Sequence, residues 1–111
     1  LAKTAADLGE RARSKRLVPD DVQGGTFTIT NVGVFGGTFG LPIINQPQAA
    51  ILGIGSVQKR AVVVSDAIAI RPMCYLSLSF DHRIIDGREA VGALRRIKEI
   101  IEDPPRMLLE V

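Results

Sequence analysis

The sequence predicts an α+β fold, in which a sheet of several short strands carries helices on one face. Two observations support this prediction. Amphipathic helical patterns lie near the two ends of the chain, and segments with strand-like alternation fill the region between them. We expect the strands that follow the long loop at residues 32–48 to pair antiparallel. With 111 residues, the chain is one domain or part of one.

The first half of the chain predicts one helix and one strand. Residues 1–16 place four apolar residues at helical spacing, Leu1, Ala5, Leu8 and Ala12. Residues 18–25 form a turn cluster, and residues 26–31, TFTITN, alternate with period two as a strand does. Residues 32–48 combine glycines and prolines with large apolar side chains. We expect this long loop to be ordered because it buries part of itself.

Three strand segments and a second helix are predicted in the rest of the chain. Residues 49–57 indicate a buried strand, and residues 61–71 a hairpin that turns near Ser65 and Asp66. Residues 72–80 predict another strand, with Cys74, Leu76, Leu78 and Phe80 on one face and Met73, Tyr75, Ser77 and Ser79 on the other. Asp86 is a good N-cap for the second helix, with Glu89 at the capping-box position. Its apolar stripe comprises Ala90, Val91, Leu94, Ile97, Ile100 and Ile101, and EDPPR ends it.

Composition excludes several classes of function. Fourteen basic and twelve acidic residues give a net charge of +2, without a basic stripe interleaved with aromatic residues, so we predict no nucleic-acid partner. One cysteine, Cys74, allows no disulfide framework and no paired zinc ligands. No span of about twenty apolar residues is present, so no membrane partner is predicted. With 46% apolar residues, the chain has more apolar surface than one small sheet can hide. We expect something else to cover it.

His82 is the single histidine of the chain and lies in the stretch SFDHRIIDGREA. At the end of a buried strand, its imidazole could act as a general base near neutral pH. It could also be a polar loop residue, whereas a metal site would have only carboxylates as further ligands, so no metal is predicted. Asp86 could orient the ring or a neighbouring arginine, or simply cap the helix. Asp81 and Arg83 could pair with other elements and fix the loop.

A family resemblance rests on these residues. SFDHRIIDG resembles the histidine motif of the dihydrolipoamide acyltransferases, which form the cores of the 2-oxo acid dehydrogenase complexes. The similarity continues through GGTFTITNVGVFGG, PIINQPQAAILGIG, IRPMCYLSLSFDHRIIDGREAV and IKEIIEDPPRMLLEV. It implies a chloramphenicol acetyltransferase-like fold with a mixed or antiparallel sheet, of which residues 1–111 would be the C-terminal half of one catalytic domain. An uncapped start at Leu1 agrees with that expectation.

The resemblance also implies roles for three catalytic residues. His82 would remove the proton from the thiol of coenzyme A, which attacks the thioester on a lipoyl group. Thr30 would donate a hydrogen bond to the oxyanion, although the residues without the resemblance favour an ordinary strand threonine at this position. Asp86 would hold the histidine loop in shape. Coenzyme A and the lipoyl group are then substrates, and no residue that binds them is assigned.

Assembly and acyl specificity follow from the resemblance as expectations. The chain would form trimers, with His82 and Thr30 of one chain serving different sites, and the trimers would build a cubic or dodecahedral core. Dehydrogenase and dihydrolipoamide dehydrogenase components would bind through domains outside this chain. Succinyl is the expected acyl group, with acetyl or branched-chain acyl groups as alternatives. A further alternative is an assembly fragment without turnover. The expected compartment is the bacterial cytoplasm, or the mitochondrial matrix in a eukaryote.

Overall fold

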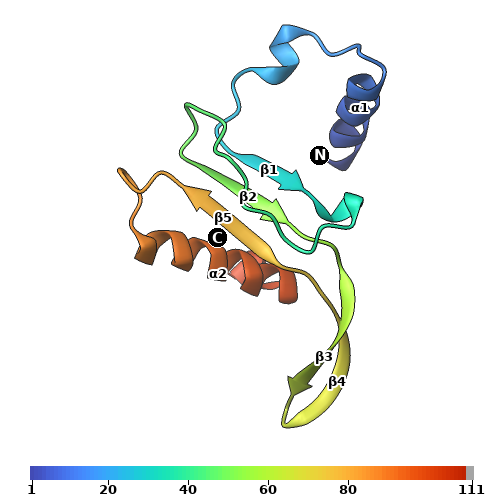
Figure 1. Cartoon of the computed structure of the whole chain (residues 1–111), viewed down its shortest axis with the longest axis vertical. Coiled ribbons are helices and arrows are strands. Elements are labelled where there is room, and N and C mark those ends of the chain that lie inside the picture. Colours follow the sequence, from blue (N-terminus) through green and yellow to red (C-terminus); the bar gives the residue numbers. More distant parts are fainter. Residues whose placement is uncertain (110–111) are drawn as a thin grey trace.

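The computed structural model, which describes residues 1–109, contains two separate sheets (Figure 1). The larger sheet has three strands in the order β1 (Thr28–Asn31), β2 (Ala50–Ile54) and β5 (Leu76–Phe80). The smaller sheet pairs β3 (Gln58–Val64) with β4 (Ala67–Met73). The α+β class predicted from the sequence is therefore confirmed.

The three-stranded sheet is mixed. β2 pairs antiparallel with β5, with Ala50 opposite Phe80, but β1 runs parallel to β2, with Thr30 opposite Gly53. The antiparallel pairing predicted for the strands after the long loop is confirmed for β2 with β5. β1 precedes that loop and runs parallel to β2, because the loop brings the chain back to the start of β2. Parallel neighbours need such a crossover of a dozen or more residues. Here it carries only the short 3₁₀ turn η2 (Gly33–Phe35).

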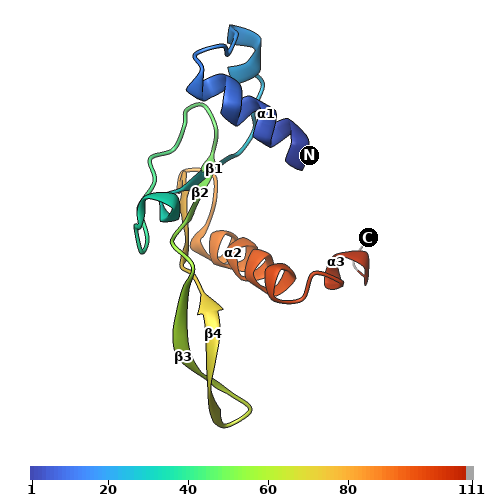
Figure 2. The same cartoon turned by 90° about the vertical axis from the view of Figure 1, so that its right-hand side faces the viewer.

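The predicted hairpin is confirmed. β3 and β4 pair antiparallel around a turn at Ser65 and Asp66, whose φ angles are 51° and 64°. Two successive residues with positive φ form the type I′ turn that suits a two-residue hairpin. The hairpin projects from the three-stranded sheet at the bottom of both views (Figures 1 and 2).

The single strand predicted at residues 72–80 is wrong, because the chain changes sheets inside it. β4 ends at Met73 and β5 begins at Leu76, so Met73, Cys74 and Tyr75 do not continue the faces of β5. Cys74 is exposed. A period-two pattern runs through such a break unchanged, because both flanking segments are strands. The alternation itself is correct within β5: Leu78 and Phe80 face the second helix, and Ser77 and Ser79 face away from it.

Helix α2 (Gly87–Glu102) packs on one face of the three-stranded sheet against β5 and buries Ala90. It ends at the predicted EDPPR segment and is followed by the short helix α3 (Arg106–Leu109). Helix α1 (Ala2–Arg13) lies apart from the sheet in both views and has no buried residue (Figures 1 and 2). An ion pair of 2.7 Å between Arg11 and Asp21 ties it to the 3₁₀ turn η1 (Pro19–Val22). The expected packing of helices on the sheet is therefore supplied by α2 alone.

The core is small. Among residues 1–109, the buried apolar side chains are Ile51 and Leu52 of β2 and Ala90 of α2. Large apolar side chains on the loop and the hairpin are exposed, among them Phe35, Ile43 and Ile68. This agrees with the expectation that the chain carries more apolar surface than it can hide.

Candidate active site

The loop between β5 and α2 holds His82 at the end of the sheet. The backbone N–H of Asp81 donates to the carbonyl of Ala49 (2.8 Å), and the N–H groups of Ile84 and Ile85 donate to the carbonyl of Asp81 (3.1 and 3.0 Å). His82 is exposed, and its ring lies 5.4 Å from the ring of Phe80. The backbone of the loop is therefore fixed while the imidazole remains accessible.

Asp81 and Arg83 pair with each other across this loop. Nε of Arg83 donates to Oδ1 of Asp81 (3.0 Å) and Nη2 to Oδ2 (2.9 Å), while the backbone N–H of Arg83 also donates to Oδ1 (3.0 Å). These hydrogen bonds, the side-chain ones first, lower the pKa of Asp81 to about 2. The prediction that the two residues pair with other elements is wrong, because a bidentate pair forms between near neighbours.

Asp86 caps helix α2. It has an extended backbone conformation, its carbonyl accepts from the N–H of Ala90 (2.9 Å), and its own N–H donates to Oε2 of Glu89 (3.4 Å). Within residues 1–109, no hydrogen bond joins Asp86 to His82. Of the roles considered for Asp86, the structure shows the helix cap and hence an indirect influence on the histidine loop.

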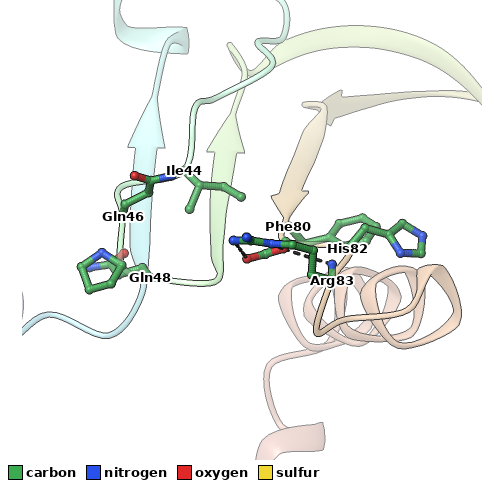
Figure 3. Close-up of a pocket in the computed structure, with 8 residues that line it drawn as sticks. Ile44, Gln46, Gln48, Phe80, His82 and Arg83 are labelled. Carbon is green, nitrogen blue, oxygen red and sulfur yellow. Dashed lines mark hydrogen bonds and ion pairs between the residues drawn. The ribbon is translucent and has the colours of Figure 1, made fainter.

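A hollow with a volume of about 580 Å³ lies beside the histidine loop. One wall is formed by residues 44 and 46–48 of the crossover and the other by residues 80–83. Figure 3 shows Arg83 on the side of the loop that faces Gln46 and Gln48, whereas the ring of His82 points away from them. His82 thus borders the hollow, but its imidazole points away from the wall formed by the crossover.

Thr30 lies on β1 in a different hollow, with a volume of about 260 Å³. Its walls include residues 40–43 of the crossover, together with Ile51 and Gly53. Thr30 is opposite Gly53, which is opposite Ser77, and residues opposite one another in adjacent strands point to the same face of a sheet. Thr30 therefore lies on the face that bears Ser77, away from α2.

The sheet separates Thr30 from His82. The ring of His82 lies against Phe80, which lines the space beneath α2 and so belongs to the other face. Thr30 lies opposite Gly53 of β2, and Phe80 lies opposite Ala50 of the same strand. Thr30 and Phe80 are therefore two strands apart across the sheet and three residues apart along it. Strand spacing places the Cα atoms of Thr30 and Phe80 roughly 14 Å apart. Because the ring of His82 lies against Phe80, the imidazole and the Thr30 hydroxyl of one chain do not face a common site.

Three hydroxyl groups hold the crossover on the sheet, and no role was predicted for them. We call residues 40–48 the crossing segment. Oγ of Ser77 donates to the carbonyl of Gly40 and Oγ of Ser79 to that of Pro42, each at 2.6 Å. Oγ1 of Thr28 donates to Oε1 of Gln48 at 2.5 Å. The signal available in the sequence was the pair of serines in the otherwise apolar strand LSLSF.

Two glycines of the β2 region allow this close approach. A Cβ atom on Gly53 would lie 2.6 Å from Oγ of Ser77 and 3.3 Å from the ring of Pro42. A Cβ atom on Gly55 would overlap the carbonyl oxygen of Thr38. The crossover therefore rests on backbone that has no side chain at the points of contact.

Two further findings concern residues 1–109 as a whole. No group of three or more histidine, cysteine, aspartate or glutamate side chains is placed to hold a metal ion in this part of the chain. None of the helices described is long and apolar enough to cross a membrane.

The chain matches known proteins along its whole length. The family model of the 2-oxoacid dehydrogenases acyltransferase (catalytic domain) matches residues 1–109. The dihydrolipoyllysine-residue succinyltransferase component of the mitochondrial 2-oxoglutarate dehydrogenase complex of Bos taurus is 52% identical over 111 residues, which are all of this chain and 24% of that protein. The corresponding component of Haemophilus influenzae is 51% identical over 111 residues, again all of this chain and 27% of that protein. The chain thus spans about a quarter of the length of these relatives.

Solved structures share the fold. The dihydrolipoamide acetyltransferase of Azotobacter vinelandii, studied for the role of a serine, a histidine and an asparagine in catalysis, has a TM-score of 0.91 and 43% identity. The cubic core of a pyruvate dehydrogenase multienzyme complex has a TM-score of 0.91 and 42% identity. Each match covers 96% of this chain and 44% of the solved chain. The chain belongs to the 2-oxoacid dehydrogenase acyltransferase family and corresponds to part of its catalytic domain.

Proposed function

We propose that residues 1–111 act as the C-terminal part of one catalytic domain in a longer acyltransferase. The enzyme transfers an acyl group between a dihydrolipoyl group and coenzyme A within a 2-oxo acid dehydrogenase complex. The observation that carries this proposal is an exposed histidine on a fixed loop, in a chain that matches the family model over residues 1–109. Coenzyme A and the lipoyl group are substrates, and the proposed chemistry needs no metal.

His82 acts as the general base. Its imidazole is held at the end of β5 by a loop with defined hydrogen bonds, and it faces solvent where a thiol can approach. Removing the thiol proton forms the thiolate, which attacks the thioester carbonyl and creates an oxyanion. The imidazolium then returns its proton to the leaving thiol as the oxyanion collapses, so the base is regenerated.

Thr30 donates the hydrogen bond to this oxyanion, and Asp86 positions the histidine loop. The spacing in the Azotobacter vinelandii enzyme supports both assignments. Its serine precedes its histidine by 52 positions and its asparagine follows the histidine by four, which are the separations of Thr30 and Asp86 from His82. Serine and threonine both offer a hydroxyl donor. An asparagine and an aspartate both cap helices, which agrees with a positioning role for Asp86.

Each active site takes His82 from one subunit and Thr30 from another. The opposite faces and the distance between these residues support this arrangement, because one chain cannot bring them together. Trimers are the smallest closed assembly we propose, and they build a larger core like the cubic core of the related pyruvate dehydrogenase complex. Dehydrogenase and dihydrolipoamide dehydrogenase components bind through domains outside this chain.

The acyl group is succinyl. Both curated relatives described above are succinyltransferase components, at 51% and 52% identity, whereas the two solved structures belong to acetyl-transferring systems at 42% and 43%. The Bos taurus relative is mitochondrial by name and the other relative is bacterial. We accordingly place the protein in the bacterial cytoplasm, or in the mitochondrial matrix of a eukaryote.

A transfer assay with the complete acyltransferase tests the proposal. Succinyl-coenzyme A and acetyl-coenzyme A are offered separately with dihydrolipoamide. The proteins are the unmodified enzyme, the His82→Ala variant and the control Ser14→Ala, at the exposed residue that follows α1. We expect transfer with preference for succinyl, loss of transfer in His82→Ala with unchanged assembly, and full activity in the control. Near-normal turnover in assembled His82→Ala would overturn the role of His82. Absence of transfer in assembled, unmodified protein would show that the core is only a scaffold.

A further inference from the structure

We infer that Ser77 and Ser79 are positioning residues for the Thr30 hollow and act through the crossing segment. This inference rests on the proposed role of Thr30. The hollow of Thr30 has residues 40–43 as one wall, and Ser77 and Ser79 hold the carbonyl groups of Gly40 and Pro42 within that wall. The two hydroxyls therefore set the distance between Thr30 and the wall opposite it.

The register of the sheet makes this connection direct. Thr30, Gly53 and Ser77 form one row across the three strands, and the row of Ser79 lies two residues along the sheet. All these side chains point to the face away from α2. Because Gly53 has no side chain, the Ser77 hydroxyl and the Pro42 ring meet directly above β2. The wall of the hollow thus stands on the same row as the proposed oxyanion donor.

Few other interactions hold the wall in place. Leu41 and Ile43 are 83% and 90% exposed, so hydrophobic burial of these side chains contributes little. The segment has no regular secondary structure, and within residues 1–109 its side-chain hydrogen bonds come from the hydroxyls of Ser77, Ser79 and Thr28. Loss of one of these bonds should let the wall move without unfolding the sheet.

The same segment continues into the wall of the histidine hollow. Residues 44 and 46–48 line that hollow, and the Thr28 hydroxyl fixes the side chain of Gln48 at its far end. One continuous segment therefore borders both hollows, with residues 40–43 lining the first and residues 44 and 46–48 the second. Its anchors on β5 lie nearer Thr30, so their loss should affect the oxyanion donor first.

A double-mutant cycle in the complete acyltransferase separates positioning from general stability. Ser77→Ala and Ser79→Ala are made alone and combined with Thr30→Ala, with Ser14→Ala as the matched control. We expect each serine variant to lower kcat about tenfold with little change in KM, as the loss of a positioning interaction does. In the Thr30→Ala background the same substitutions should lower kcat less than about twofold, because the donor they position is absent.

The outcomes distinguish this inference from the proposed function. If Thr30→Ala is fully active, the proposed oxyanion donor is wrong. A second outcome is that Thr30→Ala is impaired while the serine substitutions lower kcat by the same factor with and without Thr30, or do not lower it at all. Either result refutes the positioning role of the serines and leaves Thr30 as the oxyanion donor. If Ser77→Ala does not assemble, the same comparison of kcat with and without Thr30→Ala is made with Ser79→Ala. Ser79→Thr, which retains the hydroxyl, should restore most of the activity lost in Ser79→Ala.

Discussion

Thr30 on β1 and His82 in the loop after β5 lie on opposite sides of the three-stranded sheet. Within one chain the sheet, with β2 as its central strand, stands between the hydroxyl and the imidazole. A site that uses both residues must therefore combine two chains. This relationship makes the proposed subunit arrangement open to direct test.

Mixed assemblies of two defective variants should recover activity. His82→Ala, which should be inactive, and Thr30→Ala, which should be strongly impaired, are co-expressed with different tags, and assemblies that contain both are purified. With random mixing, about one quarter of the sites combine an intact His82 from one subunit with an intact Thr30 from the next. Transfer should therefore return to about a quarter of the unmodified level. If mixed assemblies stay inactive, His82 and Thr30 act within one chain or not together.

The structure assigns Asp86 to the cap of α2, which predicts different results for two substitutions. Asp86→Asn should keep transfer within about threefold of the unmodified enzyme, because asparagine caps helices as well as aspartate does. Asp86→Ala should lower the free energy of unfolding by about 1 kcal/mol. It should also reduce kcat by roughly tenfold, since the histidine loop loses its anchor on the helix.

Kinetics and denaturant titrations on both variants check this prediction. A similar, large loss of kcat in Asp86→Asn and Asp86→Ala would instead indicate that the negative charge itself takes part in the reaction. In that case Asp86 would orient the His82 ring directly.

The pair of Asp81 and Arg83 predicts a pH dependence confined to the acid range. The pKa of Asp81 is about 2 in the folded chain and its ordinary value is 3.8, so its ionised form is favoured by folding. The stability from this pair is present above about pH 4 and is lost as the pH falls toward 2. Unfolding by denaturant should therefore show unmodified protein more stable than Asp81→Asn at pH 5 to 7, with the difference shrinking below pH 4.

A matched control for the pH series is Asp20→Asn, which removes an exposed carboxylate in η1. The difference in free energy of unfolding between this variant and the unmodified protein should not shrink between pH 4 and 2 as it does for Asp81→Asn. A constant gap between Asp81→Asn and unmodified protein down to pH 2 would mean that the ion pair does not hold the loop.

The sequence predicted elements whose signals are local. The turn at Ser65 and Asp66, the cap at Asp86 and the end of α2 each depend on a few adjacent residues, and the structure has them at the predicted positions. The motif around His82 pointed to the family, which the comparisons confirm. Alternation also placed Ser77 and Ser79 together on the face of β5 that turns away from α2.

What the sequence missed depends on contacts between distant segments. The parallel pairing of β1 with β2 depends on the path of the long crossover between them. The change from one sheet to the other near Cys74 does not interrupt the alternating pattern of the sequence, so the pattern does not reveal it. The hydrogen bonds of Ser77 and Ser79 join residues 37 positions apart in the chain. Neither periodicity nor composition encodes such partners, so the crossing segment and its two hollows became visible only in the structure.

Gly55 should tolerate no side chain, because the backbone of the crossover lies directly against it. A Cβ atom would overlap the carbonyl oxygen of Thr38, and the N–H groups of Gly55 and Ser56 are already committed to the carbonyls of Tyr75 and Gly37. Gly55→Ala should therefore lower the free energy of unfolding by about 1–3 kcal/mol, the usual cost of overpacking. Thermal or denaturant unfolding of the complete acyltransferase measures this change.

Gly92 is the matched control, because it lies on α2 with open space around its Cα atom. Gly92→Ala should raise stability by up to about 1 kcal/mol, since alanine favours the helix over glycine. Opposite signs for the same substitution at the two glycines would show that the crossover rests on β2 as described. A neutral Gly55→Ala would mean that the crossover can lift away from the sheet, and the wall of the Thr30 hollow would then not be fixed in solution.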